Sequence, residues 1–337
     1  MSNWYFETTN EDTVVSTRIR IARNISGIPF INKMNNEQAK QIIKIVEDAT
    51  KNTNYGLKVM FLKDMDDITK LALVEKHLIS PEFALNKNEK GAIAINAEEN
   101  ICIMINEEDH IRIQTFSAGL NLENSLALAI EIEETLSKNI NYAYDEKYGF
   151  LTSCPTNVGT ALRASIMVHL PALTKTKNIV KVLNVVNGFG MNIRGIYGEG
   201  TNSKGDIYQI SNKQTLGITE EETIKNLKAI TDRVIEQEKI ARKILTKNSI
   251  ELEDEICRAY GIITNCKKIS SEECIMLLSE IRLGIELGII KQITQANLNK
   301  LEIYTKPANL QKLAGQTLEG YERDIKRAEI IKNIINS

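Results

Sequence analysis

Two arginines near the start of the chain have a spacing that suits anion binding. Arg18 and Arg20 lie in the run Ser16 to Arg23 and are separated by the β-branched Ile19. On an extended strand, residues two positions apart point to the same face, so both guanidinium groups would meet one ligand. Guanidinium groups stay charged and pair with planar oxyanions, which suits the phosphates of a nucleotide. The alternative is a solvated edge strand whose charges discourage pairing between sheets.

Three consecutive acids, Glu107, Glu108 and Asp109, follow a predicted strand. Neighbouring carboxylates repel one another and need compensation by Mg²⁺, another bound cation or an arginine, unless the segment is only a polar turn. Arg112 comes four residues after Glu108, on the next predicted strand, and is a third arginine able to bind an anion. We single out Glu108 as the candidate carboxylate of this group.

A loop of small residues, Cys154 to Thr160, precedes a segment that we expect to be a helix carrying Arg163. Helix N-termini favour anions, so the loop and the arginine would add to the same site. Close to these positive groups the pKa of the Cys154 thiol would fall; the alternative is a small, buried, apolar side chain.

A glycine-rich loop, Gly198 to Gly205, carries a second candidate carboxylate, Glu199. Arg194 ends the strand that precedes this loop. Because the loop has three glycines and few apolar anchors, we expect it to be mobile until a ligand binds.

The elements that must position these residues fall into two parts. Helical and strand patterns alternate before Thr219, long helical periods dominate from Thr219 onward, and a break near residues 248–262 marks the boundary. This change predicts a mixed domain over residues 1–250 and a small all-α domain over residues 251–337. The periods predict helices over 35–50, 120–139, 162–169, 178–188, 219–247, 250–260, 270–288, 294–303 and 321–336, and strands over 91–96, 101–105, 111–115, 191–196 and 206–211.

The composition excludes several classes of protein. The 337-residue chain has a formal net charge of −2, and its Lys and Arg residues are dispersed, so we expect no nucleic-acid partner. No apolar run approaches the roughly 18 residues of a membrane span and the N-terminus lacks a signal pattern, so we expect a cytoplasmic protein without a membrane partner. Five dispersed cysteines without a C-x-x-C pair indicate reduced thiols, and with three histidines they predict no protein-built metal site.

Four segments that carry the candidate residues resemble the phosphagen (guanidino) kinases in order and spacing. They are STRIRIAR, NEEDHIR, YGFLTSCPTNVGTALRAS and RGIYGEGTNSKGDIYQISN, within residues 14–250. The resemblance implies an α+β fold, with an antiparallel sheet flanked by helices, and ATP and Mg²⁺ as cofactors. It also implies that Glu108 and Glu199 hold a guanidinium, that Cys154 lies beside the reacting nitrogen, and that the nucleotide phosphates are clamped by Arg18, Arg20, Arg112, Arg163 and Arg194.

Such a reaction depends on in-line positioning and charge neutralisation more than on covalent chemistry. Because the pKa of a guanidinium exceeds about 12, a carboxylate must accept its proton as the N–P bond forms. Either Glu108 or Glu199 could take this role.

Two features resemble the bacterial protein-arginine kinases within this family. The arginine strand begins at residue 16, so we expect no N-terminal helical domain of the kind that encloses free guanidino acids, and a helical domain follows residue 250. An acceptor site without that enclosure suits a polypeptide.

The C-terminal segment supports the narrower resemblance, since it fits the RDxxRA signature of a phosphoarginine pocket. Arg323 and Arg327 are four residues apart, share a helix face and would grip a phosphate, while Asp324 would pair with the guanidinium. The alternative is a solvated helix face with an Asp324–Arg327 ion pair.

The expected function is therefore ATP-dependent phosphorylation of arginine side chains in proteins. The resemblance further implies a role in stress response, marking of proteins for a Clp protease, a small activator protein and a homo-oligomer, dimeric or larger. One alternative is a kinase of free arginine or another small guanidino compound. Another is a non-catalytic adaptor that binds phosphoarginine; the presence of both glutamates and all five arginines favours a catalyst.

Overall fold

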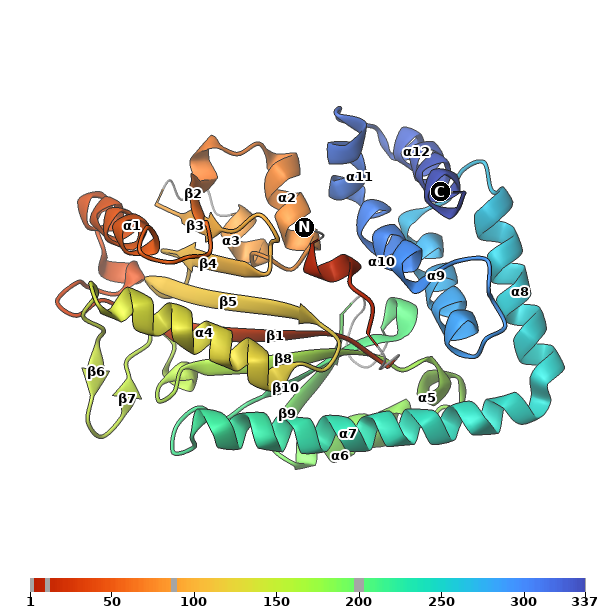
Figure 1. The fold of residues 1–337 in the computed structure, drawn as a ribbon, viewed down its shortest axis with the longest axis horizontal. Helices are drawn as coiled ribbons and strands as arrows, with labels where there is room; N and C mark the ends of the chain where they lie inside the picture. Colours follow the sequence, from red (N-terminus) through yellow and green to blue (C-terminus); the bar gives the residue numbers. More distant parts are fainter. Residues whose placement is uncertain (1–2, 10–12, 86–89, 197–202, 337) are drawn as a thin grey trace. The chain divides into compact units, whose positions relative to one another are not determined.

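The computed structural model describes residues 3–9, 13–85, 90–196 and 203–336. Among them, eight strands form one sheet in the order β2-β3-β4-β5-β1-β8-β10-β9 (Figure 1). The pairs β2–β3, β3–β4, β4–β5 and β1–β5 are antiparallel, which confirms the predicted fold class. The strands are β1 (Val14–Arg23), β2 (Lys58–Phe61), β3 (Ala92–Ile95), β4 (Ile101–Ile105), β5 (Ile111–Ala118), β8 (Leu162–His169), β9 (Met191–Gly195) and β10 (Ile207–Asn212), with a separate hairpin of β6 (Tyr144–Asp145) and β7 (Gly149–Phe150).

The chain divides into two compact units. The first comprises Met1–Trp4, Ser16–Ser165 and Ser211–Lys228, and the second comprises Tyr5–Val15, Ile166–Ile210 and Ala229–Ser337. The helices are α1 (Asn36–Thr50), α2 (Asp67–Glu75), α3 (Pro81–Leu85), α4 (Leu122–Ser137), α5 (Pro171–Lys175), α6 (Ile179–Gly188), α7 (Glu220–Leu245), α8 (Ser249–Asn265), α9 (Ser271–Glu286), α10 (Gln295–Tyr304), α11 (Pro307–Ala314) and α12 (Gly320–Ile335).

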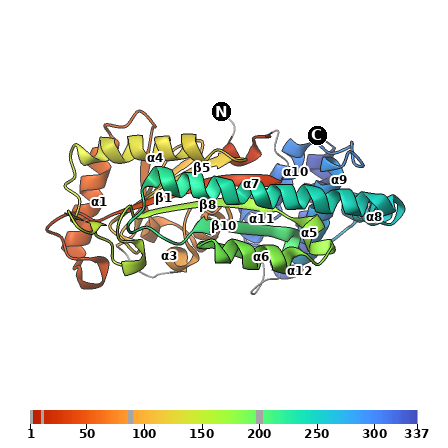
Figure 2. The same cartoon turned by 90° about the horizontal axis from the view of Figure 1, so that it is seen from below.

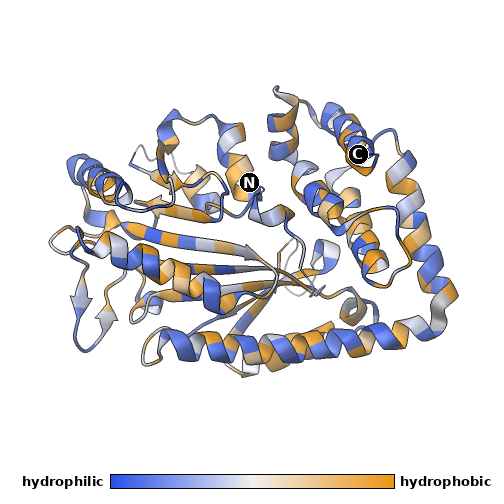
Figure 3. Ribbon diagram, viewed as in Figure 1, coloured by the Kyte–Doolittle hydropathy of each residue, from blue (hydrophilic) through white to orange (hydrophobic). Residues whose placement is uncertain are grey.

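In the first unit, α1 and α4 cover one face of the sheet. Ile42 of α1 and Ile132 of α4 are fully buried in one cluster with Ile111 and Ile113 of β5. The hydropathy colouring shows the amphipathic pattern of α4, which lies along β5 (Figure 3). Because neighbouring strand residues point to opposite faces, Arg112 projects from the other face of β5. The helices α1 and α4 thus fill one side of the sheet, and Arg112 lies on the other.

The helices α8 to α12 build the core of the second unit. Their apolar stripes bury Ile256, Leu278, Ile281 and Leu298 in one cluster. Side-chain caps define several starts; for example, the hydroxyl of Ser270 accepts a hydrogen bond from the backbone N–H at the third residue of α9. Within this unit α6 and the later half of α7 lie on opposite sides of β10 (Figure 2).

Buried charged side chains also occupy the core of the second unit. Glu238 of α7 accepts hydrogen bonds from two backbone N–H groups at the start of α5 and from Arg242 Nε at 3.0 Å. Arg242 also forms an ion pair of 2.7 Å with Glu286 of α9. Burial raises the pKa of Glu286 to about 7 against the effect of Arg242, and burial lowers the pKa of His169 to about 3.

One secondary-structure prediction was wrong, because residues 162–169 form strand β8 and not a helix. The elements that were not predicted are β2, β6, β7, α2, α3, α5 and α11. Six of the eight residues of β8 are buried, so neither the alternation of a one-sided strand nor a helical stripe is visible in its sequence. Among the described residues, no helix is long and apolar enough to cross a membrane.

Candidate active site

A pocket of about 260 Å³ in the first unit collects most of the predicted site residues. It opens on the face of the sheet opposite α1 and α4. Its walls come from β1, from the turn between β4 and β5, from β5, from the loop after β7 and from β8. The lining residues are Arg20, Ala22, Glu108, Arg112, Cys154, Thr156, Asn157, Ala161 and Arg163.

Strand register places the arginines of β1 and β5 on one face. Ala22 pairs with Arg112, and Arg20 pairs with Gln114 in the antiparallel β1–β5 ladder. Directly paired residues project from the same face of a sheet, as do residues two apart. Arg18 therefore shares the face of Arg20, and its Nε donates to Ser165 Oγ at 3.4 Å rather than lining the pocket.

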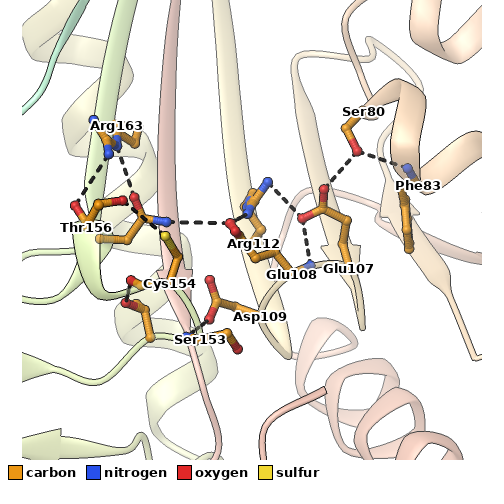
Figure 4. A network of polar contacts seen from close by, with 12 residues as sticks. Ser80, Phe83, Glu107, Glu108, Asp109, Arg112, Ser153, Cys154, Thr156 and Arg163 are labelled. Atoms are coloured by element: carbon orange, nitrogen blue, oxygen red, sulfur yellow. Dashed lines mark hydrogen bonds and ion pairs between the residues drawn. The ribbon is translucent and has the colours of Figure 1, made fainter. Parts of the chain in front are cut away.

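Arg112 compensates the acidic triplet. Its guanidinium contacts Glu107 Oε2 at 2.7 Å and also pairs with Glu108 Oε2 (Figure 4). The side chain of Glu107 is 11% exposed and that of Glu108 is 44% exposed. Of the alternatives considered, the described residues therefore supply the arginine partner, and Glu108 is the more accessible carboxylate.

Glu107, one of the three consecutive acids, also supports the site, although only Glu108 was singled out from the sequence. Its carboxylate accepts hydrogen bonds of 2.8 Å from Ser80 Oγ and from the backbone N–H of Glu108. Ser80 in turn accepts from the backbone N–H of Phe83 in α3. Both glutamates pair with Arg112, and what distinguishes Glu107 is its lower exposure and its hydrogen bond from Ser80.

Cys154 lies half-buried at the pocket wall, with its Sγ 3.1 Å from Thr156 Oγ1. The expected helix N-terminus beside it is absent, because β8 follows the loop and only a short 3-10 turn, Pro155–Asn157, comes after Cys154. The predicted anion site at a helix N-terminus is therefore wrong. The sheet brings Cys154 close to the arginines, because β1, β5 and β8 carry Arg20, Arg112 and Arg163 and the loop with Cys154 leads into β8.

The loop after Cys154 is held by a close backbone approach. Gly159 has φ of +113°, and a Cβ there would lie 2.2 Å from the backbone oxygen of Thr215. The Thr215 hydroxyl donates to the carbonyl of Thr156 at 3.0 Å. A residue with a side chain would displace this segment, so glycine is required for the loop to reach the pocket.

Asn157 connects the two halves of the pocket and was not predicted. Its Oδ1 accepts from Arg163 Nε at 3.1 Å, and its Nδ2 donates to Glu108 Oε2 at 3.5 Å. Arg163 also donates to the backbone oxygens of Asn212 and Lys213. Burial lowers the pKa of Arg163, and the charge of Glu108 acts in the opposite direction.

Besides Arg18, the predicted residues Arg194 and Glu199 are not among the described residues that line the pocket. Arg194 is an exposed residue of β9 in the second unit. Glu199 lies outside the described residues, as do the first five residues of the glycine-rich loop.

The C-terminal candidates lie on α12 in the second unit. Arg327 is 1% exposed; its Nε donates to Thr305 O at 2.8 Å, and its Nη1 donates to Ile269 O and Asp324 Oδ1 at 2.7 Å. Arg323 is half-buried and donates to Leu318 O at 3.0 Å. The Asp324–Arg327 ion pair is thus present, but the arginine is buried and does not lie on a solvated face.

Two family models match the chain. The model for the ATP:guanido phosphotransferase C-terminal catalytic domain matches residues 38–241, and the model for the protein-arginine kinase McsB C-terminal domain matches residues 249–337.

Curated relatives match over nearly the full chain. A protein-arginine kinase from Clostridium kluyveri is 46% identical and covers 98% of both chains. One from Geobacillus stearothermophilus is also 46% identical, over 96% of this chain and 90% of the relative.

Two solved kinase structures share the fold of about 69% of this chain. The taurocyamine kinase from Schistosoma mansoni with bound transition state analogue components has a TM-score of 0.61 at 28% identity, covering 69% of this chain and 34% of that one. A lombricine kinase has a TM-score of 0.60 at 26% identity, covering 69% of this chain and 68% of that one.

Proposed function

This chain belongs to the protein-arginine kinases of the ATP:guanido phosphotransferase family, and from that premise we propose that it transfers the γ-phosphoryl group of ATP to arginine side chains of proteins. The observation that carries the proposal is the pocket in which three arginines, Glu108 and Cys154 meet. Phosphoryl transfer requires that the reactants be positioned in line and that charge on the phosphates be neutralised. This set of residues offers both.

The arginines of the pocket form the phosphate side of the proposed site. Arg20, Arg112 and Arg163 line it, and Arg18 projects from the same face of β1. We assign Arg194 to the same clamp on the strength of its motif. Guanidinium groups in low-dielectric surroundings stabilise the charge that spreads over the transferring group.

Mg²⁺ would enter with the nucleotide. The described residues contain no group of three side chains suited to a metal ion. That fits an ion held mainly by substrate phosphates with one or two carboxylates, which is the usual arrangement for Mg²⁺. When bound, the ion would neutralise part of the phosphate charge.

Glu108 and Glu199 form the acceptor side. Glu108 already binds a guanidinium, that of Arg112, and Arg112 has a second carboxylate partner in Glu107. A substrate arginine can therefore replace Arg112 at Glu108 while Arg112 stays on Glu107 and turns towards the phosphates. The acceptor nitrogen then attacks the γ-phosphorus, ADP leaves, and one of the two glutamates accepts the nitrogen's proton.

Cys154 would lie beside the reacting nitrogen. It sits on the wall of the same pocket as Glu108 and contacts the Thr156 hydroxyl. Its role in the proposal is to orient the guanidinium, since no covalent intermediate is needed for in-line transfer.

We propose a second site on α12 that binds phosphoarginine. Arg327 has its Nε and Nη1 occupied by two carbonyl oxygens and Asp324. It would therefore fix Asp324 for the guanidinium, while the half-buried Arg323 supplies the more accessible charge for the phosphate. The proposed domain division, 1–250 and 251–337, separates this site from the catalytic one and is supported by the limits of the two family models.

The remaining proposals rest on the family alone. They are a cytoplasmic location, a role in stress response and Clp-dependent degradation, a small activator protein, and assembly into a dimer or larger homo-oligomer.

The function is tested by incubating the full chain with Mg-ATP and an unfolded protein, then analysing the protein by mass spectrometry for acid-labile phosphoarginine. A parallel reaction contains free arginine, and both are repeated with any activating partner. Glu108→Gln should abolish labelling, and Glu134→Gln, an exposed glutamate of α4 outside the pocket, should retain it. Phosphorylation of free arginine without protein labelling would establish the metabolite kinase instead, and binding without any transfer would establish the adaptor.

A further inference from the structure

A buried carboxylate just behind the pocket joins the loops that carry Glu108 and Cys154. Asp109 is 0% exposed and does not line the pocket. Its Oδ1 accepts a hydrogen bond of 2.7 Å from the backbone N–H of Ser153, the residue before Cys154 (Figure 4). One carboxylate thus follows Glu108 directly in sequence and holds the backbone beside Cys154.

Asn24, which follows β1, completes this connection. Its Nδ2 donates to Asp109 Oδ1 at 2.7 Å and to the backbone oxygen of Leu151 at 3.0 Å. Its Oδ1 accepts from the backbone N–H of His110 at 3.0 Å. The Asn24–Asp109 pair therefore ties three segments together: the end of the arginine strand, the turn with Glu108 and the loop with Cys154.

His110, the residue after Asp109, belongs to the same hydrogen-bond network as a neutral side chain. Burial lowers the pKa of His110. Its Nδ1 accepts a hydrogen bond of 3.0 Å from the backbone N–H of Ile25, so the ring proton resides on Nε2, which donates to Pro29 O at 2.9 Å. Asp109 is thus held by hydrogen bonds beside a neutral ring.

The same oxygen, Asp109 Oδ1, accepts both hydrogen bonds, one from the backbone N–H of Ser153 and one from Asn24 Nδ2. Within the described part of the chain, Asp109 Oδ2 and the hydroxyl of Ser153 are buried without a hydrogen-bond partner. A buried unpaired oxygen is unfavourable and is seldom retained without a reason. Here the reason is the connection made by Oδ1, because an alkyl side chain at this position could not hold Ser153 and Asn24 at once.

We propose that Asp109 is a positioning residue, which sets the distance between Glu108 and Cys154 through its bonds to Ser153 and Asn24. This inference rests on the proposed function, since it concerns the acceptor side of that reaction. A displacement of about 1 Å between reacting groups can lower a rate by about 100-fold. The phosphate side has other supports, because Arg163 is held by Asn157 and Asn212.

The test compares Asp109→Ala, Asp109→Asn and Asn24→Ala with the natural chain and with Asp48→Ala, an exposed aspartate of α1. Asp109→Ala should lower kcat for protein arginine by about 100-fold and raise the acceptor KM, with the affinity for an ATP analogue unchanged. Asp109→Asn should retain most of the activity, because an amide oxygen can accept the same two hydrogen bonds. Asn24→Ala keeps the bond to Ser153 and should fall between them.

Alkylation of Cys154, followed on its own peptide by mass spectrometry, provides a readout that a general loss of stability would not mimic. In the natural chain, nucleotide and acceptor together should protect the thiol. In Asp109→Ala, the protection that the acceptor adds should be lost and the effect of the nucleotide should remain.

The proposal is overturned if Asp109→Ala keeps its kcat. It is also overturned if activity, nucleotide affinity and melting temperature fall together in Asp109→Ala and Asp109→Asn gives no rescue. If Asp109→Ala does not fold, Asn24→Ala and Asp109→Asn decide by the same criteria. Inactivity of the natural chain towards protein arginine would instead count against the proposed function, and is seen before any variant is compared.

Discussion

Two arginines of this molecule, Arg112 in the pocket of the first unit and Arg327 on α12 of the second, differ in what their guanidinium groups contact. In the pocket, Arg112 pairs with the carboxylates of Glu107 and Glu108. On α12, Arg327 donates to two backbone carbonyl oxygens as well as to Asp324. A carboxylate side chain can exchange its partner by a rotation, whereas a carbonyl of a packed segment moves only with the chain. The first arrangement suits ligand exchange, and the second suits the stability of the fold.

The largest expected effect comes from replacing Glu108, the accessible carboxylate partner of Arg112. Glu108→Ala should lower kcat by about 10³-fold with little change in the KM for ATP, because the guanidinium and not the nucleotide loses its partner. Steady-state kinetics with varied ATP and varied protein substrate separate the two parameters, and Glu134→Ala is the matched control. A large rise in the ATP KM would place Glu108 on the phosphate side.

Arg327→Ala tests the structural side. Its removal leaves the carbonyl oxygens of Thr305 and Ile269 unpaired in the interior, and should lower the free energy of unfolding by about 3 kcal/mol or more. Urea denaturation measures this change.

Arg323→Ala is the counterpart on the same helix. It should weaken phosphoarginine binding with little loss of stability, because Arg323 makes one carbonyl contact. Equal destabilisation by both variants would remove the distinction between them.

The buried ion pair Arg242–Glu286 extends the comparison to pH. Burial raises the folded-state pKa of Glu286 to about 7 from its usual 4.5, so the folded protein binds this proton more tightly than the unfolded chain does. Its contribution to stability is therefore present below pH 4.5 and lost as the pH rises to about 7. Glu286→Gln should remove this loss, so that the variant gains about 3 kcal/mol relative to the natural chain across that window.

His169, whose Nδ1 lies 3.9 Å from Glu286 Oε1, has a pKa shift of opposite sign. Its folded-state pKa is lowered to about 3, so its contribution to stability is gained as the pH rises from about 3 to 6.5. That gain should remain in Glu286→Gln. Parallel stability curves for the variant and the natural chain would contradict the role assigned to Glu286.

The smallest expected effect concerns Cys154. Cys154→Ala should lower kcat by about tenfold, since phosphoryl transfer depends on positioning and not on a covalent intermediate. Alkylation of the thiol should slow the enzyme, and ATP with acceptor should protect it. If alkylation of Cys154→Ala causes the same slowing, the reactive thiol lies elsewhere.

Much of the fold was predictable because its signals are local. The helical periods of α1, α4, α7 and α9 and the alternation in β3 to β5 matched the structure closely. Strand β8 was mistaken for a helix because it is buried on both faces, which removes the period-two pattern. The motifs identified Arg20, Glu108 and Cys154 of the pocket, but they did not single out Asn157 in the pocket or Asp109 behind it.

The sequence by itself determined which charges and thiols the protein has, and their spacing along each strand and turn. That was enough to indicate an anion clamp and a guanidino kinase family, because side-chain chemistry and local periodicity reside in short segments. Only the tertiary structure decided which groups are free to act. Arg163 is held by Asn212, Asp109 by Ser153 and Asn24, and Arg327 by Ile269. Each of these partners lies dozens of residues away in the chain, so burial and hydrogen bonding between distant segments separate binding residues from structural ones.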